Sequence, residues 1–191
     1  DSTGNGSDTY PFGTIQHAIN RSSANDTVGI LIGTYYEQVT ISHSLVLKGI
    51  KQYYEKPILD GSGSGRIITV ADDDNITLRL EDLVLKNGYS TASGGAVYAF
   101  YPQITIEHCE FFNNSSAEGG AVKTNDPNSL INRSYFESNN AVSGGAVWAG
   151  GGVIDSCEFV NNTATGNGGA VTVEDNTTIS RSLFVTNSAT N

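Results

Sequence analysis

The stretch Gly94-Gly95-Ala96-Val97 decides the fold, because the same tetrapeptide returns at Gly119–Val122, Gly144–Val147 and Gly168–Val171. Successive copies start 25, 25 and 24 residues apart. A second motif, Phe-x-x-Asn, keeps the same period; its copies are Phe111/Asn114, Phe136/Asn139, Phe159/Asn162 and Phe184/Asn187, with a degenerate copy at Val84/Asn87. Two motifs that share one period predict an array of stacked units.

Each unit reads as short strands separated by bends. In the unit before Asn114, Ile104 and Ile106 alternate with polar residues, and so do Cys109 and Phe111, but the two pairs are out of phase. Such a unit is too small to bury a core alone, whereas coiled units stacked on one another can. The sequence therefore predicts an all-β, right-handed parallel β-helix with rungs of about 24–25 residues. We expect the repeated Phe side chains to stack in a column and the repeated Asn side chains to form an amide ladder.

The N-terminal part has a different pattern. Residues 11–21 show helical spacing of apolar side chains, and Thr14 is a plausible N-cap. We expect this helix to cover the first rung. The predicted organisation is an N-terminal segment with the capping helix at 1–26 and the β-helix at 27–191, with regular repeats from about residue 75.

Composition limits the functional classes. The formal net charge of −10 argues against nucleic-acid binding, which requires clustered Lys and Arg, and no apolar run is long enough to span a bilayer. The chain starts at Asp1 and contains no Met, so we expect a removed signal peptide or an excised fragment. Sequons for N-glycosylation indicate an extracellular or cell-surface protein; they begin at Asn5, Asn20, Asn25, Asn75, Asn113, Asn114, Asn132, Asn161 and Asn176.

The two cysteines are predicted to be free. Cys109 and Cys157 each lie two residues before the repeat Phe, two units apart. Two rung spacings separate them by roughly 9–10 Å, beyond the limit of about 7 Å between the Cα atoms of a disulfide. We expect buried, unreactive thiols.

With these motifs in place, the chain resembles the pectin-lyase-like superfamily of parallel β-helices. The segments that resemble its usual entry into the coil are Phe12–Ile19, Asp26–Val28, Gly33–Glu37 and Ser44–Leu47. The paired Gly-Gly-Ala-Val and Phe-x-x-Asn motifs resemble the repeats of chlamydial polymorphic outer-membrane proteins and of adhesin-like surface proteins of methanogenic archaea. The resemblance implies the fold; it leaves function open, because the superfamily contains lyases, hydrolases, adhesins and structural proteins.

A catalytic site is only weakly indicated. Glu81, His108, Arg133 and Arg181 fall in one outward register, three residues before the repeat Phe, with Ser156 in the same column. This column is the best candidate for a lyase or hydrolase site, but an ordinary solvent-exposed face is the favoured interpretation. Glu107, Glu110, Asp155 and Glu158 flank it and are candidate cation ligands.

Other candidate sites follow from residue type. Asp72, Asp73 and Asp74 form an acidic run that favours a cation such as Ca²⁺, although it lacks the pattern of an EF-hand loop. No other cofactor is indicated. Four aromatic side chains beside the Gly-Gly-Ala-Val strands are expected to be exposed and are candidates for glycan or partner contact: Tyr89, Tyr98, Tyr101 and Trp148.

Three functions therefore stay open: a non-catalytic surface protein with a structural or adhesive role, a polysaccharide lyase or glycoside hydrolase, and a carbohydrate- or partner-binding module. The sequence favours the first. Ser188-Ala189-Thr190-Asn191 stops just after a repeat. We therefore expect either a longer natural chain or self-association through the β-helix ends, in a cell-envelope layer or a filament.

Overall fold

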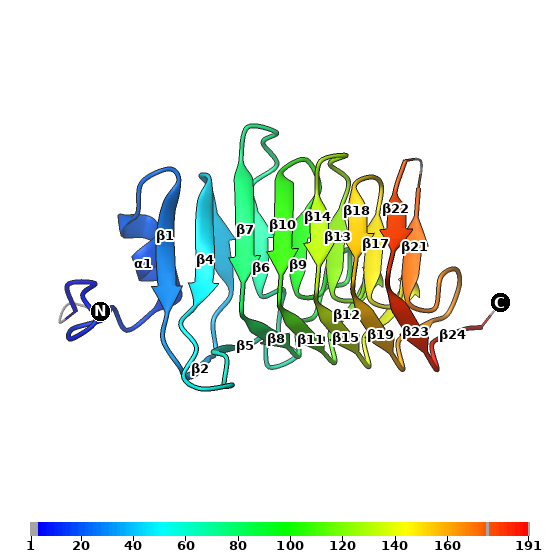
Figure 1. Ribbon diagram of the computed structural model, residues 1–191, viewed down its shortest axis with the longest axis horizontal. Helices are drawn as coiled ribbons and strands as arrows, with labels where there is room; N and C mark the ends of the chain where they lie inside the picture. Colours follow the sequence, from blue (N-terminus) through cyan, green and yellow to red (C-terminus); the bar gives the residue numbers. More distant parts are fainter. Residues whose placement is uncertain (1–3, 175, 191) are drawn as a thin grey trace.

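The computed structural model describes residues 4–174 and 176–190 and is a parallel β-helix with one short helix, α1 (Ile15–Arg21). Figure 1 shows the rungs stacked side by side along the long axis, with α1 at the N-terminal end. The predicted fold class is confirmed. Of the predicted regions, residues 1–3, Asp175 and Asn191 lie outside the described residues.

Four parallel sheets run along the stack, and we number them in the order in which one full turn of the coil, such as residues 103–124, passes through them. Sheet 1 contains β1 (Asp26–Ile30), β4 (Leu45–Gly49), β7 (Thr77–Glu81), β10 (Gln103–Glu107), β14 (Leu130–Asn132), β18 (Val153–Asp155) and β22 (Thr178–Ser180). Sheet 2 contains β2 (Thr34–Tyr35), β5 (Ile58–Asp60), β8 (Val84–Lys86), β11 (Glu110–Phe112), β15 (Tyr135–Glu137), β19 (Glu158–Val160) and β23 (Leu183–Val185). Sheet 3 contains β12 (Ser115–Glu118), β16 (Asn140–Ser143), β20 (Thr163–Ala164) and β24 (Ser188–Ala189). Sheet 4 contains β3 (Val39–Ile41), β6 (Ile68–Val70), β9 (Val97–Ala99), β13 (Val122–Thr124), β17 (Val147–Ala149) and β21 (Val171–Val173).

Columns of similar side chains fill the interior of the coil. Phe111, Phe136, Phe159 and Phe184 stack with consecutive ring centroids 4.7, 4.8 and 4.8 Å apart, and the first three are fully buried. An aliphatic column on sheet 1 runs parallel to them through Leu80, Ile106, Ile131, Ile154 and Ile179. Because one side chain meets its equivalent in the next rung, a repeat of one sequence gives a continuous apolar core.

The repeated asparagines form a ladder at the turn after sheet 2. Asn139 is fully buried; its Oδ1 accepts from the backbone N–H and the Nδ2 of Asn114, both at 3.0 Å. Its Nδ2 donates to Asn162 Oδ1 and to the Phe111 carbonyl, also at 3.0 Å. Asn162 repeats this pattern with Asn187. The ladder therefore supplies hydrogen bonds to backbone groups that the bend removes from the sheets.

The two glycines of each Gly-Gly-Ala-Val motif are required for different structural reasons. The first glycine has a positive φ in all four copies, between 59° and 65°, a conformation that glycine adopts without steric cost. The second glycine lies against the next rung, so that a Cβ on Gly120 would come 2.1 Å from the Gly145 carbonyl oxygen. The motif is therefore required by the stack itself.

Residues with positive φ also turn the chain at two further corners. The corner between sheets 1 and 2 is made by Asp82, His108, Arg133, Ser156 and Arg181, with φ between 46° and 54°. The corner after sheet 2 is made by Asn87, Asn113, Ser138, Asn161 and Thr186. These bends account for the change of phase between the strands of one unit.

This geometry corrects the degenerate copy of the Phe-x-x-Asn motif. Leu85, and not Val84, pairs with Phe111, and Gly88 takes the ladder position because its N–H donates to Asn114 Oδ1 at 2.8 Å. Asn87 is a bend residue instead. Asn suits both places, since it tolerates positive φ and also forms side-chain ladders. The motif was therefore assigned one residue too early in this unit.

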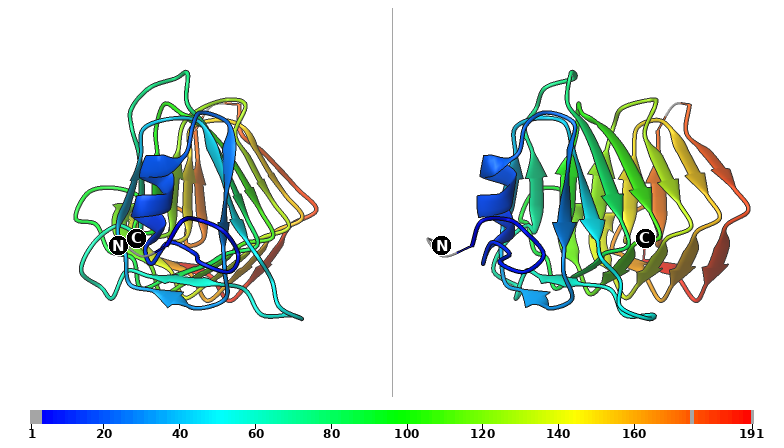
Figure 2. Two further views of the ribbon diagram at one scale, coloured as in Figure 1. Left: turned by 90° about the vertical axis from the view of Figure 1, so that its left-hand side faces the viewer. Right: turned by 60° about the vertical axis from the view of Figure 1, so that its left-hand side comes forward.

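Helix α1 closes the N-terminal end of the stack (Figure 2). Its Ile15 and Ile19 are buried in the core, and the Thr14 side chain accepts from the His17 N–H at 3.2 Å, as expected of an N-cap. The helix begins four residues later than the predicted 11–21. Across the part of the chain that the structure describes, no helix is both long and apolar enough to cross a membrane.

Both cysteines are free and buried, as predicted. Burial raises the pKa of Cys109 to about 12 and that of Cys157 to about 11. Thiols with such pKa values hold almost no thiolate at neutral pH and are poor nucleophiles.

Candidate functional surfaces

The predicted catalytic column is a column of bend residues. His108, Arg133 and Arg181 lie in it together with Ser156, one residue per rung. Glu81 does not: it pairs with Glu107 in sheet 1, and Asp82 takes its place in the column. The misplacement follows from the one-residue slip described above. His108, Arg133 and Arg181 are exposed.

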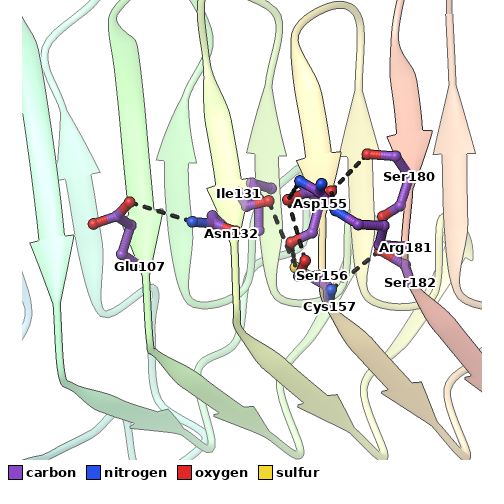
Figure 3. A network of polar contacts seen from close by, with 9 residues as sticks. All are labelled: Glu107, Ile131, Asn132, Asp155, Ser156, Cys157, Ser180, Arg181 and Ser182. Atoms are coloured by element: carbon purple, nitrogen blue, oxygen red, sulfur yellow. Dashed lines mark hydrogen bonds and ion pairs between the residues drawn. The ribbon is translucent and has the colours of Figure 1, made fainter.

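Arg181 is engaged by its neighbours, as Figure 3 shows. Its guanidinium donates from Nε to Asp155 Oδ1 at 2.9 Å and from Nη2 to Asp155 Oδ2 at 2.5 Å. Hydrogen bonds from Arg181, Ser180 and Ser156 hold the pKa of Asp155 well below its ordinary value. This bidentate pair joins β18 to the corner that follows β22, so it connects adjacent rungs.

Three of the four candidate cation ligands form ion pairs with Arg or Lys side chains of the protein itself. Glu107 is paired with Arg79, which also pairs with Glu81, both at 2.5 Å. Glu110 pairs with Lys56 at 2.7 Å, and Asp155 with Arg181. Within residues 4–174 and 176–190, no group of three or more His, Cys, Asp or Glu side chains is arranged to hold a metal ion.

The acidic run Asp72–Asp74 forms an exposed turn. Asp73 Oδ1 accepts from the backbone N–H and the Nδ2 of Asn75, at 2.9 and 2.8 Å, and these bonds lower the pKa of Asp73. An Asx turn of this kind is a common reason for Asp and Asn in loops. Calcium binding at this run stays a prediction.

The aromatic residues form a cluster on the outer face of sheet 4. Tyr98, Lys123 and Trp148 occupy one register position on successive rungs, and Phe100 stacks between the two aromatic rings, 6.4 Å from Tyr98 and 6.5 Å from Trp148. The Lys123 ammonium lies 3.2 Å from the Trp148 ring centroid and 2.7 Å from Glu118 Oε2. This is a cation–π contact within an ion pair.

Trp148 was expected to be exposed, and that expectation is wrong. Only 6% of it is accessible, because Lys123 and Phe100 from earlier rungs pack on it. Tyr89 and Tyr101 are exposed, at 44% and 54%, and Tyr98 is half-buried. Among the four candidate residues, the accessible aromatic surface is therefore formed by the tyrosines.

The sequons divide into two groups by accessibility. Asn114 and Asn132 are buried, and both amide hydrogens of Asn114 are used in the ladder. The others present an exposed asparagine: Asn5, Asn20, Asn25, Asn75, Asn113, Asn161 and Asn176. A glycan on Asn114 is incompatible with the ladder.

The fold defines the chain as a parallel β-helix repeat protein. Residues 156–174 match the family model described as the Chlamydia polymorphic membrane protein (Chlamydia_PMP) repeat. The matched segment contains Phe159/Asn162 and Gly168–Val171, so the β-helix carries repeats like those of the PMP proteins. No curated protein and no solved structure matches the chain. The likeness indicates a surface or adhesin-like protein.

Proposed function

We propose that this chain is a non-catalytic extracellular surface protein, a β-helix with an adhesive or structural role. The observation that carries the proposal is the match to a surface-protein repeat in the very residues that build the rungs. The ion pairs support it, since three of the four carboxylates that flank the bend column are bound to Arg or Lys of other rungs. Side chains held in this way stabilise the stack.

Labelling of intact cells tests the location. Cells that make the protein are treated with a membrane-impermeant amine reagent, which reaches exposed lysines such as Lys51. We expect labelling before lysis, whereas a cytoplasmic control protein is labelled only afterwards. Labelling of both proteins only after lysis would contradict the proposal.

Self-association through the β-helix ends, in an envelope layer or filament, is the finer part of the proposal. Unpaired strand edges at the end of a solenoid pair readily with further strands. Electron microscopy of the natively sourced protein, combined with its intact mass, tests this part. Filaments or sheets support it; dispersed monomers at micromolar concentration contradict it.

A further inference from the structure

Strands β1 and β3 form the N-terminal edges of sheets 1 and 4, and α1 covers the edge of β3. The Gln16 side chain binds both backbone groups of Thr40 that face outward: its Oε1 accepts from the Thr40 N–H at 2.7 Å, and its Nε2 donates to the Thr40 carbonyl at 3.2 Å. The Glu37 carboxylate fixes the helix there, since it accepts from the N–H groups of Ile15 and Gln16 at 2.9 and 3.1 Å. A side-chain amide thus replaces the neighbouring strand and blocks this edge.

The edge of β1 is left open. Successive residues of a strand direct their backbone groups to opposite sides, and the Ile30 carbonyl faces β4, where it accepts from the Ile50 N–H at 2.8 Å. Thr27 and Gly29 therefore direct their N–H and C=O groups away from β4. Among residues 4–174 and 176–190, no hydrogen-bond partner of these four groups is found. They form a short template for a further strand.

A groove lies along this open edge. It has a volume of about 460 Å³, and its lining includes Thr27 and Gly29 of β1 together with Ile15 and Ala18 of α1. Figure 2 shows the helix and the strand at this end of the stack. A strand beside β1 would turn every second side chain toward the interior of the coil, where Ile15 is buried in the core and Ala18 packs against it. The groove therefore offers backbone partners together with an apolar surface.

These features specify a single extended peptide as the occupant. Unpaired backbone groups at a sheet edge supply the hydrogen bonds of strand addition, and an adjacent apolar surface receives alternate side chains. A complete rung of a second copy does not fit, because Ile15 and Ile19 of α1 already fill the place that the interior of such a rung would need. The open edge is short, since the Leu31 carbonyl already accepts from the Tyr35 hydroxyl at 2.9 Å.

We propose that the groove between α1 and β1 binds an extended peptide segment of another protein, which adds one parallel strand to sheet 1 and pairs with Thr27 and Gly29. The segment carries apolar side chains at alternate positions, which face α1. It has no Pro at the paired positions, because Pro lacks the N–H group. Such a groove would act at any cellular location, so this assignment does not rest on the proposed function.

Amide-resolved NMR titration with N-methylated peptides tests the assignment. The probe is an acetylated and amidated octapeptide in which three Val alternate with three Ser between terminal Lys residues. Methylation of the Val amides removes the N–H donors along one edge of the extended probe, and methylation of the Ser amides removes those along the other. In a parallel strand with Val toward the interior, the Val amides face β1, just as the inward-facing Ile30 faces β4.

We expect the unmethylated and the Ser-methylated probes to shift the amide signals of Thr27 and Gly29. The Val-methylated probe should have a Kd at least tenfold higher. Equal affinities of the two methylated probes, shifts confined to another face, or no shift at millimolar concentrations would overturn the assignment. Loss of binding with the Ser-methylated probe instead would overturn the parallel orientation.

Two variants at one position isolate the backbone donor. Thr27→Pro removes an N–H that faces the groove and no bond of the sheet, and an edge strand tolerates such a proline. Thr27→Val keeps the N–H. We expect at least tenfold weaker probe binding for Thr27→Pro and a change of less than twofold for Thr27→Val. Equal loss in both would overturn the proposal, and should Thr27→Pro unfold, the methylated probes on the unchanged protein decide.

A second copy of the chain is the alternative occupant, and analytical ultracentrifugation without the probe tests for it. We expect Thr27→Pro to leave any self-association unchanged. Self-association that this variant abolishes would place a second copy in the groove and overturn the peptide assignment. Failure of probe binding leaves the surface-labelling result untouched, so the two proposals fail separately.

Discussion

Removal of one step of the asparagine ladder should be far more costly than removal of a similar side chain next to it. Asn139→Ala deletes four hydrogen bonds, two accepted from Asn114 and two donated to Asn162 and Phe111. The backbone N–H of Asn114 and the carbonyl of Phe111 lose these partners in fully buried residues. One Nδ2 hydrogen of Asn114 loses its acceptor as well.

The magnitude follows from the groups left unpaired. A buried donor or acceptor without a partner costs about 1–3 kcal/mol. Three such groups give about 3–9 kcal/mol for Asn139→Ala, and we expect the lower half of that range if water enters the space. Asn140→Ala is the matched control, because Asn140 is exposed and makes only one side-chain hydrogen bond, to Thr163 at 2.8 Å. We expect the control to cost less than about 1 kcal/mol.

Urea unfolding followed by far-UV circular dichroism measures both variants. The difference in the free energy of unfolding is taken from the midpoints, provided that the slope of each transition is unchanged. A loss for Asn139→Ala no larger than that for Asn140→Ala would refute the reasoning, since the ladder would then contribute nothing beyond a surface side chain.

Three further predictions concern the core, the ion pairs and the thiols. Phe136→Ala, between two stacked rings, should lower the free energy of unfolding by about 3–5 kcal/mol; a loss below about 1 kcal/mol in the same urea assay would contradict the aromatic column. Arg181→Ala should raise the pKa of Asp155 toward the ordinary carboxyl value in an NMR titration. Because the pKa of Asp155 is lowered in the folded state, its stabilising effect is present above the ordinary carboxyl pKa and is lost as the pH falls through the folded value; acid unfolding that stays at the same pH in this variant would contradict the pair. Cys109 and Cys157 should react with a thiol reagent at pH 8 only after unfolding, and rapid reaction of the native protein would contradict their burial.

The rungs could be predicted because each rung must satisfy the same packing requirements as its neighbours. Phe136 must fit between Phe111 and Phe159, and Gly120 must leave space for the rung that follows. These packing requirements recur with one period along the chain, and the residues that meet them therefore form sequence motifs. Asn87 shows the limit of the pattern, because an asparagine suits both the bend and the ladder.

The surfaces were harder to predict because they depend on contacts between rungs. Trp148 looked exposed, yet Lys123 from the preceding rung covers it. The polar groove lined by Gln38, Ser64, Arg66 and Tyr89 could not be predicted, since its residues come from three turns that no motif connects. A lone arginine that follows a glycine-rich turn carries no signal of its orientation in the sequence.

The central claim is that one repeat makes one rung, and a single distance tests it. Thr27 and Thr178 are exposed at the two ends of sheet 1, and the register joins them through Val46, Arg79, Thr105, Leu130 and Val153. Six rung spacings amount to roughly 29 Å. Spin labels on Thr27→Cys and Thr178→Cys, with the two native cysteines replaced by Ser, make this distance measurable by pulsed electron paramagnetic resonance. A narrow distribution near that distance, widened by the label arms, is the predicted result; a broad distribution without a maximum there would contradict the stack.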